Sequence, residues 1–362
     1  MRSHKPDYLI VACLAFLVLA GLLALASASS NLGQEKFDDS FYYLKHQIFN
    51  GLFFGIIGFF LAYSIYYRRY QKLALIFLLL TLVLTALVFT PLGLKAGGAD
   101  RWLKIGPVTF QPAEFLKLSV IIYFAAWLAG QNERNSSFWK GTMPFLIVLA
   151  AVGAILLKQP TTTTIVIISV SALALYFVSG AKLSHVAGMV AIGLVALAFI
   201  VVITPYRFQR ITNFLNPDAN PLGAGYHRNQ AQIAIGAGKL FGVGYGKSTT
   251  KINYLPEPIG DSIFAVVAEE FGFVGSIGLL SIFLLLVMRI LLLARKVKDK
   301  FGKLLLVGFG TLLSLQVFIN IGAISGLLPL TGVPLPFISY GGTALAVFMT
   351  MGGIITNISK HA

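Results

Sequence analysis

The sequence predicts an all-α, polytopic integral membrane protein with about ten transmembrane helices. Hydrophobic residues make up 57% of its 362 residues and charged residues only 11%. Soluble domains carry about twice that charged share. The apolar residues form long runs along the whole chain, and a helix needs roughly 20 of them to cross about 30 Å of hydrocarbon. We therefore treat residues 1–362 as a single transmembrane domain.

Ten apolar runs reach, or nearly reach, the length of a membrane-spanning helix. Along the chain they cover residues 8–27, 48–67, 73–91, 113–130, 143–158, 161–178, 184–204, 262–293, 304–326 and 338–357. Arg2 and Lys5 precede the first run, and Ala26-Ser27-Ala28 resembles a signal-peptide cleavage site. The run exceeds the apolar core of about 7–15 residues found in cleavable signals. We expect it to be retained as the first helix.

Basic residues are concentrated in one set of short loops, at 68–72, at Lys182 and above all at 295–303. Lysine and arginine favour short cytoplasmic loops. This pattern places both termini in the cytoplasm, in agreement with an even number of spans. The net charge of +15 then faces anionic lipid headgroups at the inner leaflet, and we expect no nucleic-acid partner.

With the amino terminus inside, residues 28–47, 92–112 and 205–260 should form outward-facing loops. The last of these, between helices 7 and 8, is the longest polar interruption. Loops longer than about 12–15 residues are usually functional or disordered. This one is rich in Gly, Pro and Asn but keeps apolar residues throughout, so we expect it to be folded. It should contain a short amphipathic helix at about 226–238. The glycine-rich stretch 236–248 indicates tight turns and close backbone approach, because no strand precedes it and its spacing does not fit a phosphate loop.

Charged residues inside spans are costly, which marks them as functional or as paired. Glu114 and Lys117 are three residues apart and therefore share one helix face. They form either an internal ion pair or a pair that lines a polar cavity, and the residues alone leave both open. Glu269 and Glu270 lie in the eighth span. One of them should pair with a basic residue elsewhere, for which Lys117 is a candidate.

Asp261 stands where the eighth span begins. Aspartate is among the best N-cap residues, so the local sequence by itself favours a helix cap. A carboxylate at the outer membrane boundary, facing a polar loop, could also serve as a base. The two roles do not exclude each other.

Nine basic residues on the outward side run against the charge bias of the loops. They would contact anionic headgroups, or bind a pyrophosphate or a similar multiply charged anion, which arginine holds bidentately. These residues are Arg101, Lys104, Lys158, Arg207, Arg210, Arg228, Lys239, Lys247 and Lys251. The five histidines, at 4, 46, 185, 227 and 361, show no metal-ligand spacing, so no metal site is predicted.

Three stretches, in chain order, resemble the motifs of the SEDS family, which includes FtsW, RodA and SpoVE. They are 97–103 with 110–117, then 251–270 with its Leu-Pro-Glu…Asp…Glu-Glu order, then 334–343. The resemblance covers essentially the whole chain. It implies a peptidoglycan glycosyltransferase of the bacterial cytoplasmic membrane that joins lipid II units on the outer face, for cell division or cell shape. It also implies a class B penicillin-binding transpeptidase as partner.

The resemblance assigns roles to individual residues. Asp261 matches the family's essential aspartate, which moves its interpretation from cap to catalytic residue. Glu114 and Lys117 match the pair of the fourth helix, and Arg101 matches the arginine of the second outer loop. The predicted pyrophosphate-binding residues are Arg101, Arg207, Arg210 and Lys251, and the predicted supporting residues are Glu257, Glu270, Asn320 and Ser339.

The chain also departs from the family pattern. The family commonly has Ala-His-Thr-Asp-Phe around the aspartate, where residues 258–262 read Pro-Ile-Gly-Asp-Ser, so no adjacent histidine can assist Asp261. Residues 159–164 lack the acid and the glycine of the family's Pro-Asp-x-Gly-Thr motif. We therefore assign no cofactor, and a role for Mg²⁺ or Mn²⁺ stays open. The sequence at 223–226 and 332–336 resembles the FtsW division branch more closely than RodA.

The resemblance implies an inverting reaction. Asp261 would take the proton from the 4-hydroxyl of the GlcNAc of an incoming lipid II as that oxygen attacks the anomeric carbon of the growing strand. Outward cations would stabilise the departing pyrophosphate. Two other hypotheses are a lipid II flippase, which predicts inverted halves that the sequence does not show, and a non-catalytic scaffold that recruits the transpeptidase.

Overall fold

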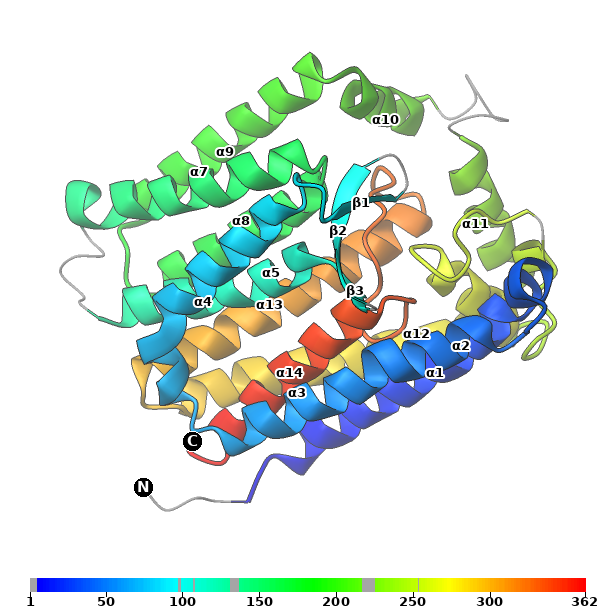
Figure 1. Cartoon of the computed structure of the whole chain (residues 1–362), viewed down its shortest axis with the longest axis horizontal. Coiled ribbons are helices and arrows are strands. Elements are labelled where there is room, and N and C mark those ends of the chain that lie inside the picture. The colour runs from blue at the N-terminus through cyan, green and yellow to red at the C-terminus, as the bar shows by residue number, and fades with distance from the viewer. Residues whose placement is uncertain (1–4, 97–98, 107, 131–136, 217–224, 253) are drawn as a thin grey trace.

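The computed structural model describes the chain except residues 1–4, 97–98, 107, 131–136, 217–224 and 253 (Figure 1). Its α-helices are α1 (Tyr8–Phe37), α2 (Tyr42–Gln47), α3 (Phe53–Ser64), α4 (Arg68–Leu87), α5 (Pro112–Ala129), α7 (Met143–Lys158), α8 (Thr162–Val178), α9 (Leu183–Ile203), α10 (Pro205–Leu215), α11 (Tyr226–Ala237), α12 (Ile263–Lys296), α13 (Lys300–Ile324) and α14 (Gly342–Ser359). Two short π-helices are η1 (Ile48–Leu52) and η2 (Phe138–Thr142), and a short 3-10 helix is η4 (Thr250–Ile252). Three strands, β1 (Gly93–Ala96), β2 (Ala99–Ile105) and β3 (Val108–Phe110), complete the elements.

The predicted membrane-spanning architecture is confirmed. Among the described residues, nine helices are long and apolar enough to cross a bilayer. Two of these are composite, because η1 joins α2 to α3 and η2 leads into α7. Helix α8 is a further apolar helix of 17 residues, just below the usual length for a span. The all-α class therefore holds, while the exact number of crossings stays a prediction.

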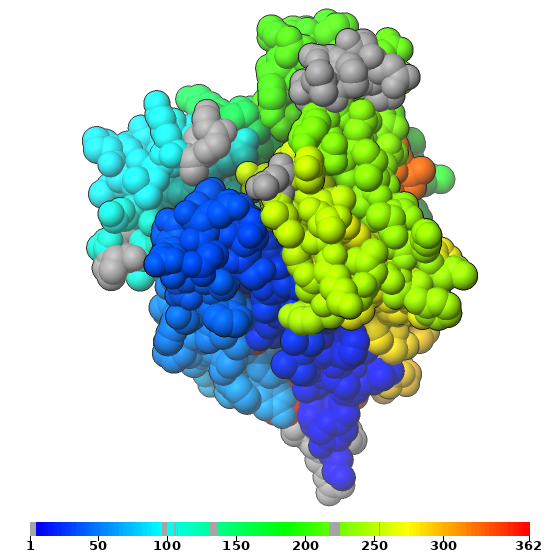
Figure 2. Space-filling view, turned by 90° about the vertical axis from the view of Figure 1, so that its right-hand side faces the viewer, coloured from blue at the N-terminus to red at the C-terminus, as the bar shows by residue number. Residues whose placement is uncertain are grey.

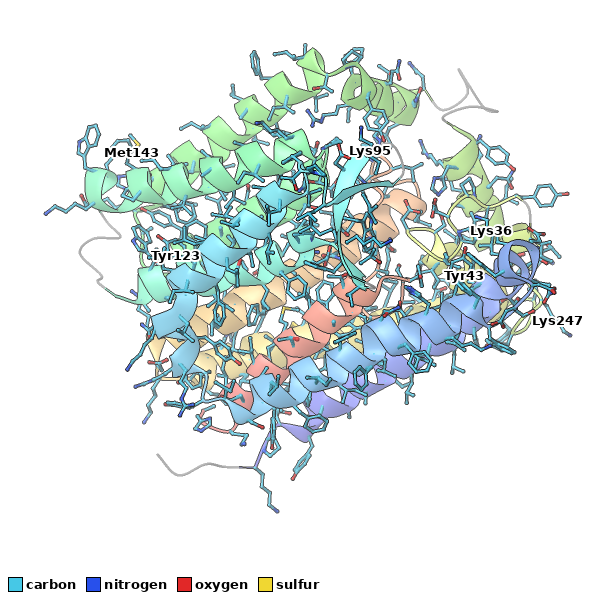
Figure 3. All side chains as sticks on the ribbon, in the orientation of Figure 1. Lys36, Tyr43, Lys95, Tyr123, Met143 and Lys247 are labelled. Atoms are coloured by element: carbon cyan, nitrogen blue, oxygen red, sulfur yellow. The ribbon has the colours of Figure 1, made fainter. Side chains whose placement is uncertain are left out.

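The start of α1 and the end of α14 lie at one end of the helix bundle, and α11 lies at the other (Figure 1). We call the end that carries α11 the outer end, after the orientation predicted from the basic loops. In Figure 3 it is marked by Lys247, whereas Met143 marks the opposite end. Helices α5, α13 and α14 are the most buried, and α1 packs along α12. Helix α9 is peripheral, since Met189 alone among its residues is buried. Its apolar side chains are exposed on the outside of the helix bundle.

Helix α1 continues well past its predicted end at residue 27. Two side-chain pairs at i,i+4 spacing support the polar extension: Asn31 donates to Glu35 at 2.7 Å, and Gln34 donates to Asp38 at 2.5 Å. Asp38 then ends the helix in the left-handed region. The expectation of a loop over 28–47 is therefore wrong for most of that segment.

The two later outer segments are folded. Residues 92–112, expected to form a loop, contain an antiparallel sheet of order β1-β2-β3. In 205–260 the predicted amphipathic helix at about 226–238 is confirmed as α11. Helix α10 was not foreseen; it begins with Pro205, whose missing N–H is not needed in a first turn. Figure 2 shows the outer end, where α11 and the segment after it cover much of the surface beside α1 and α2.

Helix α12 is broken at Gly272, which has a φ of +67°. The segment 239–244 crosses this break. Its N–H groups donate to the freed carbonyls of Glu269 and Glu270 at 2.9 and 3.0 Å, and its carbonyls accept from the first two N–H groups after the break at 2.8 and 3.0 Å. A Cβ atom at Gly242 would lie 2.1 Å from the Glu270 carbonyl oxygen. The expected close backbone approach of this glycine-rich stretch is therefore confirmed.

Candidate active site

Asp261 ends a tight turn that precedes α12 at the outer end. The N–H groups of Gly260 and Ser262 donate to the carbonyl of Glu257 at 3.0 and 3.2 Å. Ser262 is the N-cap residue of α12, and no side chain caps this helix end. The cap interpretation of Asp261 is therefore wrong. The turn instead projects the carboxylate beside the helix terminus.

Two of the predicted supporting residues hold the backbone of this turn. Asn320 donates from Nδ2 to the carbonyl oxygens of Asp261, at 2.9 Å, and Val333, at 2.7 Å. The Ser339 hydroxyl donates to the Gly260 carbonyl at 2.7 Å. These contacts join α13 and the 334–343 motif to the turn. They fix the position of Asp261 without touching its carboxylate.

The Asp261 carboxylate borders a cavity of about 280 Å³ at the outer end. Its side chain is 13% exposed, and Oδ1 has no hydrogen-bond partner. The other lining residues are Tyr206, Gln209, Arg210, Asn213, Phe214, Gly225, His227, Arg228, Leu330 and Gly332. Loop 205–260 and the segment before the 334–343 motif thus enclose the carboxylate.

Burial, and after it the negative charge of Glu257, raise the pKa of Asp261 to about 7. Backbone amides and the positive charge of Arg210 oppose this rise only in part. A group with a pKa near neutrality can both take and release a proton at working pH. The predicted supporting residue Glu257 therefore acts on Asp261 through its charge.

Two arginines line the cavity with Asp261. Arg210 donates to the carbonyl of Leu330 at 3.2 Å and to the hydroxyl of Tyr206. Arg228 donates to the carbonyls of Phe214 and Gly326 at 3.0 and 3.2 Å. Neither guanidinium has a carboxylate partner among the described residues. Their charges are thus available to an anion in the cavity.

The other predicted cations are arranged differently. Arg101 donates to the carbonyls of Gln159 and Pro160, both at 3.2 Å. Burial lowers the pKa of Arg101, and so does the nearby charge of Arg210, which places the two cations in one electrostatic neighbourhood. Arg207 donates to Thr204 at 2.9 Å and does not line the cavity.

Lys251 is not brought to the cavity. Its Nζ lies 2.6 Å from Oε1 of Glu270 in a buried ion pair, and it also donates to Ser27 of α1 at 2.7 Å. Ser27 in turn donates to Glu270 at 2.6 Å. The prediction that one glutamate of α12 pairs with a basic residue elsewhere is confirmed by Glu270. The candidate Lys117 is wrong, because Lys117 pairs with Glu114. The Lys251–Glu270 ion pair joins the outer segment to α1 and α12.

The Glu114–Lys117 pair is internal. Lys117 Nζ lies 2.8 Å from Glu114 Oε2, and the two side chains are almost fully buried. Lys117 also donates to Gln316 at 2.8 Å, and Gln316 donates to the carbonyl of Pro334 at 3.1 Å. The pair does not line the cavity beside Asp261. Of the two alternatives, the internal ion pair holds, and it is connected to the 334–343 motif.

Comparisons with known proteins agree on one family. The family model of the FtsW/RodA/SpoVE cell cycle proteins matches residues 7–362. The chain belongs to the FtsW/RodA/SpoVE family. It is 36% identical to stage V sporulation protein E of Bacillus subtilis, covering 100% of this chain and 99% of that protein. It is 37% identical to the probable peptidoglycan glycosyltransferase FtsW of Geobacter metallireducens, covering 99% and 96%.

Solved structures show the same fold as this FtsW/RodA/SpoVE protein. A chain from a peptidoglycan synthase complex that coordinates polymerization and crosslinking is 29% identical, with a TM-score of 0.79 over 98% of this chain and 97% of that one. The rod shape determining protein RodA of Thermus thermophilus is also 29% identical, with a TM-score of 0.72 over 98% and 96%. The predicted SEDS membership is confirmed.

In this FtsW/RodA/SpoVE protein a histidine does reach the aspartate, although none is adjacent in sequence. His227 of α11 lies with Nε2 3.9 Å from Oδ1 of Asp261 and 2.6 Å from the Ser262 hydroxyl oxygen. The prediction that no histidine is adjacent to Asp261 in sequence holds, but it did not foresee that His227 lies near the carboxylate in space. Sequence reasoning missed His227 and Ser262 because the contact joins two elements whose packing no local pattern encodes.

The role of a divalent cation, which the sequence left open, stays a prediction. Within the part of the chain that the structure describes, no group of three or more His, Cys, Asp or Glu side chains could hold a metal ion. Asp261 and Glu257 are the acids of the turn, and threonines stand at 161–164, where the family motif has its acid. Some motif residues lie outside the described residues, namely Gly97 and Gly98, and Gly223 and Ala224 of the FtsW-like sequence.

Proposed function

We propose that this protein is a peptidoglycan glycosyltransferase that joins lipid II units on the outer face of the bacterial cytoplasmic membrane, with Asp261 as general base. Relatives named as probable peptidoglycan glycosyltransferases match nearly its whole length, which supports the activity. One observation carries the assignment of the base. Asp261 is a buried carboxylate with an unpartnered oxygen, and it faces the outer cavity.

The reaction needs a base at one atom. The 4-hydroxyl of the GlcNAc of an incoming lipid II attacks the anomeric carbon of the growing strand, and Asp261 takes the hydroxyl proton as the new β-1,4 bond forms. The bond from the anomeric carbon to the pyrophosphate oxygen breaks on the opposite side. Configuration is inverted, so no covalent sugar–enzyme intermediate forms.

The leaving pyrophosphate gains negative charge as the bond breaks. Cations that meet this charge stabilise the transition state more than the ground state. Arg210 and Arg228 line the cavity, and Arg101 lies within electrostatic range of Arg210. We assign the pyrophosphate to these three arginines. Lys251, paired with Glu270 in the protein interior, has a structural role in this proposal, and Arg207 remains at the edge of the site.

Two polyprenyl tails must lie in the membrane while their head groups meet at Asp261. Helix α9, which is almost entirely exposed, leads directly into α10, and α10 carries Arg210 of the cavity. A tail lying along α9 would therefore bring its pyrophosphate to the arginines. This arrangement explains why the enzyme is embedded in the membrane.

A penicillin-binding transpeptidase is the proposed partner. A similar chain is part of a peptidoglycan synthase complex that coordinates polymerization and crosslinking. The proposed orientation puts both termini in the cytoplasm. It is supported by the basic loops at 68–72 and 295–303, and the start of α1 and the end of α14 lie together at the end opposite α11 (Figure 1). Division and elongation are both compatible with these relatives.

The test is strand synthesis by purified full-length protein supplied with lipid II in detergent. Asp261→Asn keeps the size of the side chain and removes the base, so we expect a loss of about 10²-fold or more in rate. Asp38→Asn is the matched control, since Asp38 is an exposed acid at the end of α1. Wild-type synthesis by a folded Asp261→Asn variant would reject the base.

The same assay separates the rival functions. A flippase makes no polymer from lipid II that is already in solution, and a scaffold makes polymer only when its partner supplies a polymerase. The described residues contain one broken spanning helix, α12, and its break lies beneath the outer segment 239–244. Polymer formed by the chain alone, and lost with Asp261→Asn, supports the glycosyltransferase against both rivals.

A further inference from the structure

Each bond formed leaves Asp261 protonated, and the site must release that proton before the next bond. Three charged or titratable side chains act on the Asp261 carboxyl: Glu257, Arg210 and His227. Arginine stays protonated and accepts no proton. Glu257 acts on the carboxyl through its negative charge. Histidine is the group of the three that can accept the proton at working pH.

The position of His227 suits this transfer. Its Nε2 lies 3.9 Å from Oδ1 of Asp261, which is too long for a direct hydrogen bond and fits transfer through one bridging water or a small ring rotation. The imidazole lines the same cavity as Asp261. Its side chain is 21% exposed, so it reaches the carboxyl on one side and outer water on the other.

The partner of the imidazole is suited to both of its protonation states. Ser262 is fully buried, and its hydroxyl oxygen lies 2.6 Å from Nε2 of His227. A hydroxyl can donate to the neutral ring nitrogen and, after rotation, accept from the protonated one. Ser262 therefore keeps the ring in place while its charge changes.

Helix packing, rather than a loop, fixes the ring. His227, Ala231 and Ala234 follow the i, i+4, i+7 spacing of one helix face, and both alanines are fully buried. This face of small side chains lets α11 approach α12 closely. Arg228, the next residue, ties the helix to the carbonyls of Phe214 and Gly326.

We propose that His227 is the positioning residue that returns the catalytic proton: it accepts the proton from Asp261 after each bond and releases it to water in the outer cavity. The O–H bond of the Asp261 carboxyl breaks, an N–H bond forms on the imidazole, and the imidazolium then gives its proton to water. Asp261 ends as the carboxylate and His227 as the neutral ring. The inference rests on the proposed function of Asp261 as base.

The charges around the ring favour this cycle. Burial lowers the pKa of His227, and the positive charge of Arg210 lowers it further. The ring is therefore neutral at pH 7 and ready to accept. Once protonated, it gives the proton up readily, so the relay does not hold the site in its protonated form.

The test compares first-turnover and steady-state rates of bond formation by full-length His227→Ala. Asp261 is already ionised in part before the first turnover, so we expect a first bond at close to the wild-type rate. Later bonds should be slower by roughly tenfold or more, with little change in KM. Added imidazole should restore the steady-state rate of the variant in proportion to its concentration and leave the wild type unchanged.

Two further variants make the result decisive. His227→Gln keeps a hydrogen-bonding group for Ser262 but cannot carry the proton, so it should be as slow as His227→Ala. His185→Gln is the matched control, because His185 bonds Thr142 at 3.0 Å and packs on Phe138, far from the cavity. A wild-type steady-state rate for His227→Gln, or no response of His227→Ala to imidazole, would overturn the inference.

The proposed function can fail separately. Asp261→Asn should stay inactive at every imidazole concentration, because imidazole replaces the relay and not the base. If Asp261→Asn makes polymer, the base assignment is rejected whatever His227 does. If Asp261→Asn is inactive while both His227 variants behave as wild type, only the relay is rejected.

Discussion

Replacing Asp261 by asparagine should make the protein more stable above neutral pH while removing its activity. Burial, with the charge of Glu257, raises the pKa of Asp261 from an ordinary 3.8 to about 7. The folded chain thus binds this proton more tightly than the unfolded chain does. The contribution of this proton to the free energy of unfolding is present in full below about pH 4 and is lost as the pH rises to about 7.

The size of the effect follows from this pKa difference. A change of about 3 in pKa corresponds to about 4 kcal/mol between the two protonation states. The Asp261 side chain is only 13% exposed, so solvent screens the effect little. At pH 8 the wild type therefore carries a buried charge whose cost is of this order, and the neutral asparagine does not.

The assay is thermal unfolding of detergent-purified protein at several values between pH 5 and pH 8. The wild-type midpoint should fall across this range by several degrees more than that of Asp261→Asn. Asp38→Asn, which changes an exposed acid, should follow the wild type. If the midpoints of wild type and Asp261→Asn fall in parallel, other groups carry the pH dependence, and the raised pKa of Asp261 is refuted.

Three further predictions follow from the same structure. Strand synthesis by the wild type should rise with pH through about 7, because Asp261 must be ionised to act as base; a flat rate between pH 5.5 and 8.5 would contradict this. Lys251→Met should lower the free energy of unfolding by about 3–5 kcal/mol, because it leaves Glu270 buried and unpaired. The double variant Lys251→Met, Glu270→Gln should recover most of this loss, and equal unfolding midpoints for the single and double variants would speak against the pair. Gly272→Ala should destabilise α12, because residue 272 has a φ of +67° and an added Cβ atom would lie 2.3 Å from the Gly242 nitrogen. Gly278→Ala should be neutral or slightly stabilising, because its added Cβ atom would meet nothing within 4 Å. Thermal unfolding of the two variants shows whether the break at Gly272 is required.

The membrane-spanning helices could be predicted because each is set by local composition. A run of apolar residues crosses the hydrocarbon wherever it occurs, and its neighbours change this little. The ends of the helices were less predictable. Helix α1 continues past residue 27 through pairs such as Asn31–Glu35, which a hydropathy window counts as a polar interruption.

The catalytic candidate could be found through family motifs, but its surroundings could not. His227 and Ser262 are 35 residues apart, and Lys251 and Ser27 are 224 apart. Which of many polar residues meet is decided by how α11, α12 and α1 pack, and the sequence pattern of each helix allows several partners. For this reason Lys251 was expected among the anion-binding residues and is found in a buried ion pair.

The acids near the start of α12 differ in role, because some have a structural function and one is the candidate for chemistry. Glu269 accepts hydrogen bonds from the hydroxyls of Ser248 and Thr250, and Glu270 is paired with Lys251, so both charges are stabilised by the fold. Asp261 has an oxygen with no partner, although Asn320 holds its backbone. A protein under selection for stability alone would satisfy or remove such a group, because an unpartnered buried carboxylate is costly. The cost is consistent with a carboxylate kept ready to bind a proton that arrives only with the substrate.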